Sequence, residues 1–504
     1  MANPLYDTLF GAHQGQNTPF LHLLNGDTIT HRAFLSMTAQ MAHAMTQMGL
    51  AAGDRVAAQV EKSPQALALY AACVQAGLVF LPLNTAYTVD ELTYFIENSG
   101  ARLIVCDPSR ADDLAIVAAD LNAQTATLDA AGQGSLMDAA AQQADTFPTV
   151  DRSGDDLAAF LYTSGTTGRS KGAMLTQNNL LSNAQTLVDH WQFTADDVLL
   201  HALPIFHTHG LFVASNVMLL SGGSMVFMPK FDTDFMVQNM PKATTMMGVP
   251  TFYTRLLSDD RFTRELTGHM RLFISGSAPL LAETHVEFET RTGHRILERY
   301  GMTETNMNTS NPYDGERRAG TVGFALPGVE LKITDPDTGA ALPQGEIGQI
   351  EVRGPNVFKG YWQMPEKTAA ELRADGFFIT GDLGRIDADG YVHIVGRGKD
   401  LIISGGYNIY PKEIELVLDD QPGVDESAVI GVPHPDFGET VVGVLVPKAG
   451  SQIDLDQLQT AVQKQLARFK HPRKLIILDA LPRNTMGKVQ KNILREAYKD
   501  MFTT

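Results

Sequence analysis

Residues that could do chemistry are densest in the segment 162–172, which reads Tyr-Thr-Ser-Gly-Thr-Thr-Gly-Arg-Ser-Lys-Gly. Glycine lets the backbone turn tightly and bring its N–H groups against a ligand. The hydroxyl side chains add hydrogen-bond donors and Lys171 adds a positive charge, a combination that suits a polyphosphate. The segment is not a Walker A motif, because Arg169 and Ser170 separate Gly168 from Lys171.

An apolar run, Leu157–Tyr162, precedes this segment and is typical of a strand that leads into a loop. A flexible surface turn is the alternative interpretation of so many Ser, Thr and Gly residues. The upstream strand and the Lys171-Gly172 ending favour a phosphate-binding loop.

Six further motifs follow along the chain. Each of them alone is compatible with an ordinary turn or, for the last one, with an exposed basic tail. Their order and their spread over the chain are therefore more informative than any single match. They are Leu203-Pro-Ile-Phe-His207 with Thr208-His209-Gly210, Ser275-Gly-Ser-Ala-Pro-Leu280, Glu298-Arg-Tyr-Gly-Met-Thr-Glu304, Thr380-Gly-Asp382, Gly396-Arg-Gly-Lys-Asp-Leu-Ile-Ile-Ser-Gly-Gly-Tyr-Asn408 and Pro482-Arg-Asn-Thr-Met-Gly-Lys488.

The elements that position these motifs alternate between strands and helices in the first half of the chain. This alternation predicts an α/β fold with β-α-β winding and a mostly parallel sheet. Residues 110–145, rich in Ala, Asp and Gln, are expected to form helices with a variable connection. The expected strands are 55–60, 77–81, 103–106, 224–228, 272–275 and 347–352, and the first expected helix is 64–76.

At 504 residues the chain is too long for one ordinary core, so we expect two or more domains. A boundary is predicted near Gly396–Lys399, after a β-rich stretch over 386–395. The segment beyond it has its own α+β pattern and is long enough for a small core. We predict a large N-terminal domain, 1–396, with a β-rich subdomain, and a small α+β domain, 397–504. In the latter, the expected helices are 411–418 and 455–466, and the expected strands are 424–432 and 441–446.

Composition bounds the class of protein. With 44% apolar and 19% charged residues the chain is typical of a globular protein, and it has no apolar run of the roughly 18 residues that a membrane helix needs. The opening residues 1–7 show no export signal, and the cysteines, Cys73 and Cys106, are too few for a disulfide framework. We therefore expect a cytoplasmic protein whose two thiols are buried, not catalytic.

The charge balance excludes some partners. Lys and Arg number 39 and Asp and Glu number 57, a net charge of −18. Nucleic acid and anionic membranes are therefore not expected to bind. An anionic substrate would need local cationic groups.

Together and in this order, the seven motifs resemble the adenylate-forming acyl-CoA synthetase superfamily, which includes 4-coumarate ligases, luciferases and peptide-synthetase adenylation domains. The resemblance runs from about residue 10 to about residue 500. It implies a large N-terminal domain, a hinge and a small mobile C-terminal lid. It also implies two half-reactions. A carboxylate attacks the α-phosphate of ATP to give an acyl-adenylate and pyrophosphate, and the thiol of coenzyme A then displaces AMP.

The resemblance implies roles for individual residues. Thr303 would touch the α-phosphate and Glu304 would bind Mg²⁺, a hard cation that prefers oxygen ligands. Lys488 would neutralise charge on the α-phosphoryl oxygens and the attacking carboxylate, with His207 completing the catalytic set. One carboxylate, that of Asp382, would accept both ribose hydroxyls. The other residues expected to bind ATP are Thr163, Ser164, Gly165, Thr166, Thr167, Gly168, Lys171, Ser277, Ala278, Pro279, Tyr300, Gly301 and Arg397.

The second half-reaction needs Lys488 to leave the site, and Lys399 matches the hinge position of the family. Lys470 lies in a basic stretch and is a candidate for a phosphate of coenzyme A, although a surface patch is the alternative. Lys488 also resembles targets of regulatory acetylation, so an acetyltransferase and a deacetylase are possible partners. The residues expected to bind coenzyme A are Ser404, Gly405, Gly406, Tyr407 and Lys470.

The acid pocket of the family is formed by the residues after Phe-His and those flanking Tyr-Gly-Met-Thr-Glu. Here Arg299 falls in this region, and a buried, unpaired arginine would cost several kcal/mol. It should therefore bind an anion, either a second carboxylate of the substrate or a protein carboxylate such as Glu298 or Glu283.

Thr208 and His209 would add donors to this pocket, and Met307 with Thr208 would limit the substituent on the acid. The strings Glu298–Asn308 and Phe206–Gly210 resemble malonyl-CoA synthetases within the superfamily. We therefore predict ATP-dependent ligation of malonate to coenzyme A, with methylmalonate tolerated. The alternatives are a ligase for another short-chain or aromatic acid, an adenylation enzyme that loads a carrier protein, and a non-catalytic nucleotide-binding regulator.

Overall fold

The computed structural model describes residues 2–163, 170–404, 407–435, 437–466, 468–484 and 487–502. The chain divides into two compact units, of which the first comprises Met1–Leu331 and Val352–Phe378 and the second comprises Lys332–Glu351 and Ile379–Thr504. The predicted division at 396/397 and the hinge at Lys399 stay predictions. None of the helices in the described ranges combines the length and the apolar character that crossing a membrane requires.

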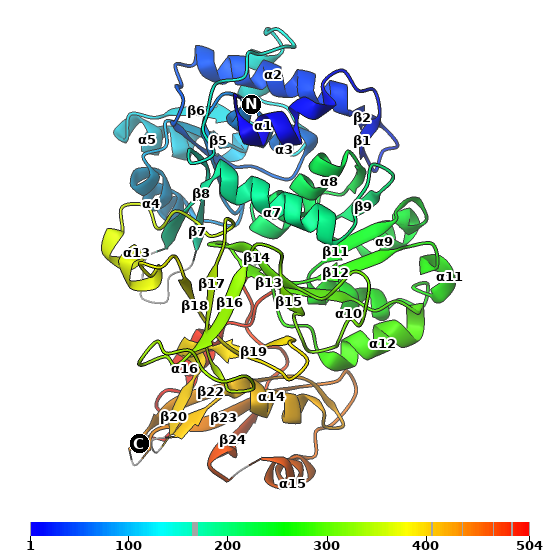
Figure 1. Cartoon of the computed structure of the whole chain (residues 1–504), viewed down its shortest axis with the longest axis vertical. Helices are drawn as coiled ribbons and strands as arrows, with labels where there is room; N and C mark the ends of the chain where they lie inside the picture. Colours follow the sequence, from blue (N-terminus) through cyan, green and yellow to red (C-terminus); the bar gives the residue numbers. More distant parts are fainter. Residues whose placement is uncertain are drawn as a thin grey trace. The chain divides into compact units, whose positions relative to one another are not determined.

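A nine-stranded sheet forms one half of the first unit (Figure 1). Its central strands, from β13 through β1, are all parallel, and antiparallel strands close both edges. The order across the sheet is β15 (Phe324–Ala325), β14 (Asn306–Ser310), β13 (Leu297–Met302), β12 (Leu272–Ser275), β11 (Thr245–Gly248), β9 (Val198–His201), β10 (Ser224–Phe227), β1 (Pro19–His22) and β2 (Thr28–Thr30).

A six-stranded sheet forms the other half, and its strands are also parallel except at one edge. At that edge β7 and β8 pair antiparallel with Thr163 opposite Lys171, so the two ends of the predicted phosphate-binding segment lie side by side. The order is β6 (Gln124–Thr127), β5 (Leu103–Cys106), β3 (Arg55–Gln59), β4 (Val79–Pro82), β7 (Leu157–Thr163) and β8 (Lys171–Thr176).

These sheets confirm the predicted α/β fold with mostly parallel winding. Among the strands that the sequence prediction did not name, β6 lies inside the stretch 110–145 that was expected to be helical. Its sequence, Gln-Thr-Ala-Thr, buries only Ala126, so the apolar pattern of a strand is missing, and pairing with β5 decides its conformation. Cys73 and Cys106 are buried thiols, as expected, and burial raises the pKa of Cys106 to about 11.

Helices pack on and between the two sheets. Helix α3 (Pro64–Gln75) is buried on every side from Ala66 to Gln75, as expected for a helix that is apolar all round. Helix α7 (Gln177–His190) begins at a capping box formed by Thr176 and Asn179, and it contacts β8 of one sheet and β14 of the other. The remaining helices of this unit are α1 (Pro4–Leu9), η1 (Gly11–His13), α2 (His31–Gln47), α4 (Val89–Ser99), η2 (Pro108–Arg110), α5 (Ala111–Asp120), α6 (Ser135–Ala140), η3 (His209–Ser215), α8 (Asn216–Ser221), α9 (Thr233–Asn239), η4 (Met240–Lys242), α10 (Pro250–Leu257), α11 (Arg264–Thr267), α12 (Ala282–Thr292) and α13 (Pro365–Glu371).

The second unit is built around a five-stranded sheet with its own core, which includes Ile414, Val429 and Leu458. The helices and strands predicted for this region are confirmed, as α14 (Pro411–Asp419), α15 (Leu455–Gln465), β22 (Val424–His434) and β23 (Gly438–Pro447). Its other elements are β20 (Ile402–Ser404), β21 (Tyr407–Ile409), β24 (Lys474–Ile477), η5 (Gly398–Asp400), η6 (Arg468–Lys470) and α16 (Lys491–Tyr498).

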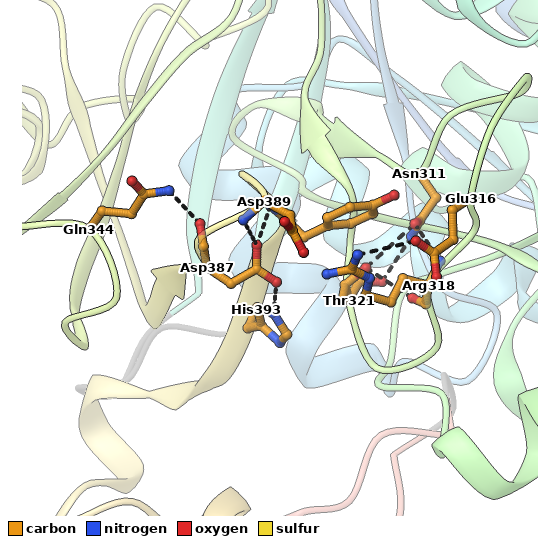
Figure 2. Close-up of polar contacts among 9 residues, drawn as sticks. Asn311, Glu316, Arg318, Thr321, Gln344, Asp387, Asp389 and His393 are labelled. Carbon is orange, nitrogen blue, oxygen red and sulfur yellow. Dashed lines mark hydrogen bonds and ion pairs between the residues drawn. The ribbon is translucent and has the colours of Figure 1, made fainter.

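A four-stranded sheet lies mostly in the second unit, in the order β16 (Glu330–Thr334), β17 (Gly348–Arg353), β18 (Phe378–Ile386) and β19 (Val392–Arg397). Figure 2 shows the turn between β18 and β19, where His393 Nε2 lies 2.9 Å from a carboxylate oxygen of Asp387. Gln344 donates to the backbone carbonyl of Asp387. These contacts fix the turn end of the β18–β19 hairpin, and Asp382 and Arg397 face each other at its other end.

One partly buried ion pair ties together the amino ends of three neighbouring strands. Arg271, just before β12, donates to both carboxylate oxygens of Asp197, just before β9, at 2.7 Å each. Thr244, just before β11, donates to the same carboxylate at 2.7 Å. A bidentate pair with this extra donor fixes the register of the three strands at the edge opposite to their carboxyl ends.

We expect Asp197→Asn to destabilise the protein by about 3–5 kcal/mol, because it leaves the Arg271 guanidinium without its counter-charge. The fall in the midpoint of urea unfolding measures this effect. The exposed neighbour substitution Asp196→Asn is the matched control and should change the midpoint little. An unchanged midpoint for Asp197→Asn would contradict the role assigned to this ion pair.

Candidate active site

The carboxyl ends of β9, β12 and β13 meet at one edge of the nine-stranded sheet, because these strands are parallel and close in the sheet order. In open α/β sheets this edge is where ligands bind. Ser275 ends β12 opposite Glu298 of β13, which places Arg299 just beyond that level. Several polar side chains gather here without the partners that burial normally demands.

The Arg299 side chain is the most unusual of them. It is 3% exposed, and its Nε and Nη2 atoms have no hydrogen-bond partner among the described residues. Burial lowers the pKa of Arg299 to about 9. The backbone of Gly276 lies against the guanidinium so closely that a Cβ there would stand 2.4 Å from Cζ. Glycine at 276 is therefore needed for this position of the arginine.

Glu298, a carboxylate that could have paired with Arg299, is held elsewhere. Its Oε1 lies 3.2 Å from His285 Nδ1 and accepts a hydrogen bond from the backbone N–H of Gly320. Asn311 donates to the Glu298 carbonyl and to that of Thr321, and Figure 2 shows Asn311 beside Thr321 and Arg318. Within the described ranges Arg299 makes no ion pair, so none of the described carboxylates neutralises its charge.

Thr208 and His209 complete the polar group. His209 begins the π-helix η3, and its Nδ1 lies 3.2 Å from the Ser277 hydroxyl. His209 Nε2, Thr208 Oγ1 and Ser275 Oγ have no hydrogen-bond partner within the part of the chain that the structure describes. Burial lowers the pKa of His209 well below its usual value and the nearby Arg299 lowers it further, so His209 is neutral at neutral pH.

The backbone around this group is also unusual. Ser277 has a φ of 72°, which a residue other than glycine rarely adopts, and such strain is concentrated at functional sites. Ala278 and Pro279 follow Ser277 after the end of β12. The π-helix η3 is itself a rare conformation that often occurs at functional sites. Two independent irregularities therefore border the unpartnered polar atoms.

Met307 lies on β14 and is buried, with its methyl group so close to Gly301 that a Cβ on the glycine would stand 2.6 Å from it. Asn183 of α7 fixes the Met307 backbone by exchanging two hydrogen bonds with it. Sequence reasoning missed Asn183, because nothing near residue 183 in the chain marks it as a neighbour of β14.

A second group of charged side chains includes Glu304, just after β13. Glu304 is buried, and its Oε1 accepts hydrogen bonds from the hydroxyls of Tyr361 at 3.0 Å and Thr163 at 3.3 Å. Burial raises the pKa of the Glu304 carboxyl. Thr303 lies next to it and directly follows β13. The predicted Mg²⁺ ligand and the start of the predicted phosphate loop are therefore in direct contact.

Lys171 belongs to the same group through residues that the motifs did not mark. Its Nζ lies 3.4 Å from the Glu371 carboxylate and 4.2 Å from the centre of the Tyr361 ring. The Tyr361 hydroxyl also lies 2.7 Å from Glu371. Tyr361 and Glu371 come about 200 residues after Lys171, and nothing in the sequence around either residue indicates this contact.

In the second unit, Asp382 is buried and pairs with Arg397, with 3.3 Å between Oδ1 and Nε. Lys399 follows in η5 and is half-buried, and burial lowers its pKa. Lys470 donates to Glu413 at 2.5 Å. The side-chain oxygen of Asn484 accepts a hydrogen bond from the backbone N–H of Lys488.

The structure places other predicted residues in their elements. His207 immediately precedes Thr208 and η3, Tyr300 and Gly301 lie on β13, and Ser404 ends β20. Seven predicted residues lie outside the described part of the chain, and so does the side chain of Tyr407. These seven are Ser164, Gly165, Thr166, Thr167, Gly168, Gly405 and Gly406.

The fold and this arrangement define a class of protein. The model of the AMP-binding enzyme family matches residues 11–362, and the model of the AMP-binding enzyme C-terminal domain matches residues 413–488. The chain belongs to the AMP-binding enzyme family.

Individual relatives are similar over nearly the whole chain. The crystal structure of ATP-bound MatB from Rhodopseudomonas palustris has a TM-score of 0.98 and is 61% identical, with 100% of each chain covered. A malonate–CoA ligase of Arabidopsis thaliana is 35% identical and covers 84% of this chain and 74% of its own length. A feruloyl-CoA synthase from Amycolatopsis is 36% identical over 94% of both chains.

We expect Arg299→Met to stabilise the protein in the absence of ligands by at least about 1 kcal/mol, because it removes a buried charge that no protein group neutralises. The midpoint of urea unfolding measures the gain. Arg32→Met, which replaces an exposed arginine of α2, is the matched control and should give no such gain. A less stable Arg299→Met variant would show that the guanidinium has a protein partner.

The gain should also depend on pH. The pKa of Arg299 is about 9 in the folded protein but returns to its usual, much higher value when the chain unfolds. Above about pH 9 the folded state therefore binds fewer protons than the unfolded state, so the stability of the wild-type protein rises relative to that of the variant. Unfolding midpoints of both proteins at about pH 8 and pH 10 should converge as pH rises; a constant difference would contradict this cause.

Proposed function

We propose that the protein joins malonate to coenzyme A in an ATP-dependent reaction that passes through malonyl-adenylate and releases pyrophosphate and AMP, and that it tolerates methylmalonate. Family membership supports the chemistry. Malonate–CoA ligases of Arabidopsis thaliana and Bos taurus, at 35% and 34% identity, support the acid. The observation that carries the choice of acid is the buried, unneutralised guanidinium of Arg299.

Malonate fits this guanidinium because it has two carboxylates. One is consumed when it attacks the α-phosphate, and the other can accept hydrogen bonds from Nε and Nη2 of Arg299 as a bidentate pair. An acid without a second carboxylate would leave the buried arginine unpaired, which is the kind of mismatch that gives strong discrimination. A feruloyl-CoA synthase is about as identical to this chain as the malonate–CoA ligases are. Overall identity therefore does not distinguish the acids, and the choice of acid rests on this pocket.

Thr208 and His209 supply further donors to the same carboxylate. Neutral His209 can donate from Nε2 if Ser277 holds a proton toward Nδ1, and Thr208 can donate from its hydroxyl. Met307 and Thr208 border the space for a substituent on the central carbon. A pocket of this kind accepts hydrogen or one methyl group there and disfavours larger groups by about 1–3 kcal/mol per methylene.

For ATP, we assign Lys171 and Thr163, with the loop Ser164–Gly168, to the β- and γ-phosphates. Lys171 would exchange Glu371 for phosphate oxygens when ATP binds, since both are anions within reach of the same ammonium. Tyr300 would stack on adenine, while Asp382 would accept the ribose hydroxyls beside Arg397. Ser277, Ala278, Pro279 and Gly301 would line the base, and Thr303 would donate to the α-phosphate.

Glu304 would hold Mg²⁺. Across the described residues no three or more His, Cys, Asp or Glu side chains form a group that could hold a metal by themselves. This fits Mg²⁺, which proteins usually bind through one or two carboxylates and the phosphates of the nucleotide. The buried carboxylate of Glu304, already held by two hydroxyls, is a suitable oxygen ligand. When bound, the ion would supply charge neutralisation to the phosphates.

Lys488 would stabilise the charge that develops during adenylation, with His207 near the acid. We place the hinge between domains 1–396 and 397–504 at Lys399, so that rotation withdraws Lys488 and brings in the residues for coenzyme A. Those residues would be Ser404–Tyr407 and Lys470, which would have to leave Glu413. Acetylation of Lys488 would block the first half-reaction by removing its charge.

The acid is tested by a panel of malonate, methylmalonate, succinate, acetate and coumarate with ATP, Mg²⁺ and coenzyme A. We expect the highest kcat/KM for malonate, and we expect Arg299→Met to lower it at least about 30-fold, the lower end of the 2–5 kcal/mol range for breaking a buried charge pair. The KM for ATP should stay unchanged. Equal malonate kinetics in the variant, or a preference for acetate or coumarate in the wild-type protein, would overturn the proposal.

Lys488→Ala should abolish formation of malonyl-adenylate while sparing transfer from supplied malonyl-adenylate to coenzyme A, because Lys488 is proposed to stabilise the first step and to leave the site before the second. Pyrophosphate release and thioester formation, measured separately, distinguish the two steps. Lys491→Ala, which removes a nearby lysine paired with Glu415, is the control. Normal pyrophosphate release by Lys488→Ala would contradict the assignment.

A further inference from the structure

Lys62 is a buried lysine that the proposed reaction does not use. It lies between β3 and α3, on the six-stranded sheet, and is 7% exposed. Its Nζ contacts three acceptors of the nine-stranded sheet, which are His201 Nδ1 at 2.8 Å, the His201 carbonyl at 2.7 Å and the Leu203 carbonyl at 3.0 Å. It also lies 4.4 Å from the centre of the Phe227 ring. Lys62 thus joins the two sheets of the first unit.

Burying the Lys62 ammonium group costs free energy, so its presence here needs a physical explanation. Within the described ranges Lys62 makes no ion pair with a carboxylate, and an apolar side chain would fill the same space without burying a charge. The three acceptors match the three N–H donors of an ammonium group. The surroundings are therefore arranged for the charged side chain, although burial lowers the pKa of Lys62.

The charged form of Lys62 dictates the tautomer of His201. An ammonium group has no lone pair, so His201 Nδ1 must accept and the ring proton must be on Nε2. Nε2 can then donate to the Gly210 carbonyl at 2.9 Å. The Ser215 hydroxyl donates to the same carbonyl at 2.9 Å. Lys62 is therefore connected through His201 to the first turn of η3.

The loop that carries Thr208 and His209 is held at both ends by this connection. Lys62 binds the Leu203 carbonyl where the loop starts, and His201 binds the Gly210 carbonyl where it ends. Gly210 is tightly enclosed, since a Cβ there would stand 2.1 Å from the Pro204 carbonyl oxygen. A shift of the Gly210 peptide would move the adjacent His209.

We propose that Lys62 is a positioning residue of the acid pocket, which through His201 and the Gly210 carbonyl sets where Thr208 and His209 lie relative to Arg299. This role rests on the proposed function, because it assumes that the acid binds at Arg299. It goes beyond that function by assigning substrate affinity to a side chain that belongs to the other sheet.

Lys62→Met should raise the KM for the acid about 10-fold to 100-fold, the cost of displacing a binding group by about 1 Å, while the KM for ATP stays within about twofold. A side chain that only stabilises the fold would not produce this split between the two substrates. Glu61→Gln, which removes the charge of the exposed neighbour, is the matched control and should change neither constant.

Two substitutions of His201 separate its two ring nitrogens. In His201→Gln the amide nitrogen reaches the position of Nε2 and can still donate to Gly210, whereas in His201→Asn the amide remains near Nδ1 and reaches only Lys62. We expect the KM for the acid to stay within about threefold in His201→Gln and to rise in His201→Asn as in Lys62→Met. This pair tests the step from His201 to Gly210 even if Lys62→Met fails to fold, which thermal unfolding would reveal.

All variants are assayed with the acid that the wild-type protein uses best in the panel. Should that acid not be malonate, the proposed function fails while the role of Lys62 is still tested with the preferred acid. An unchanged KM for the acid in Lys62→Met and His201→Asn, or an equal rise in the KM for ATP, would overturn the inference. Equal values for His201→Asn and His201→Gln would also do so.

Discussion

The proposed acid pocket depends on one guanidinium group, that of Arg299, which is buried and has no counter-charge among the residues that the structure describes. Arg299 is positioned by the close backbone of Gly276, while Glu298, its nearest carboxylate in sequence, is held by His285 and Gly320. The protein thus keeps the cation from its own anions. In the proposed function a carboxylate of the substrate supplies the missing counter-charge, and its binding free energy includes relief of the cost of burying Arg299.

Other interactions of the fold offset the free-energy cost of burying Arg299. The amino ends of β9, β11 and β12 are held by the partly buried, bidentate Asp197–Arg271 pair, whereas the carboxyl ends present donors that have no partner among the described residues. Stability and function are thereby divided between opposite edges of one sheet. Lys62, which follows β3 of the six-stranded sheet, adds hydrogen bonds to His201 and Leu203 at the carboxyl end of β9.

The two cations proposed to meet anionic substrates are treated differently. Lys171 is already neutralised by Glu371, so a phosphate must compete with a protein carboxylate for it. Arg299 has no such competitor among the described residues. In a chain with a net charge of −18, this difference is reasonable. ATP carries several charges and can displace the Glu371 carboxylate from Lys171. A small diacid offers a single free carboxylate and therefore needs a cation that no protein carboxylate already binds.

The sequence by itself determined the winding of the sheets, the strands β3, β4, β5, β7, β10 and β12 among their members, and the family, because apolar periodicity and motifs are local properties that can be read along the chain. It also identified Arg299, but left open whether Glu298 would neutralise it. Only the tertiary structure decided that question, and only it found Glu371 beside Lys171 and Lys62 beside His201, which are separated by 200 and 139 residues. Burial and pairing depend on which distant segments meet, and that is a property of the packed fold.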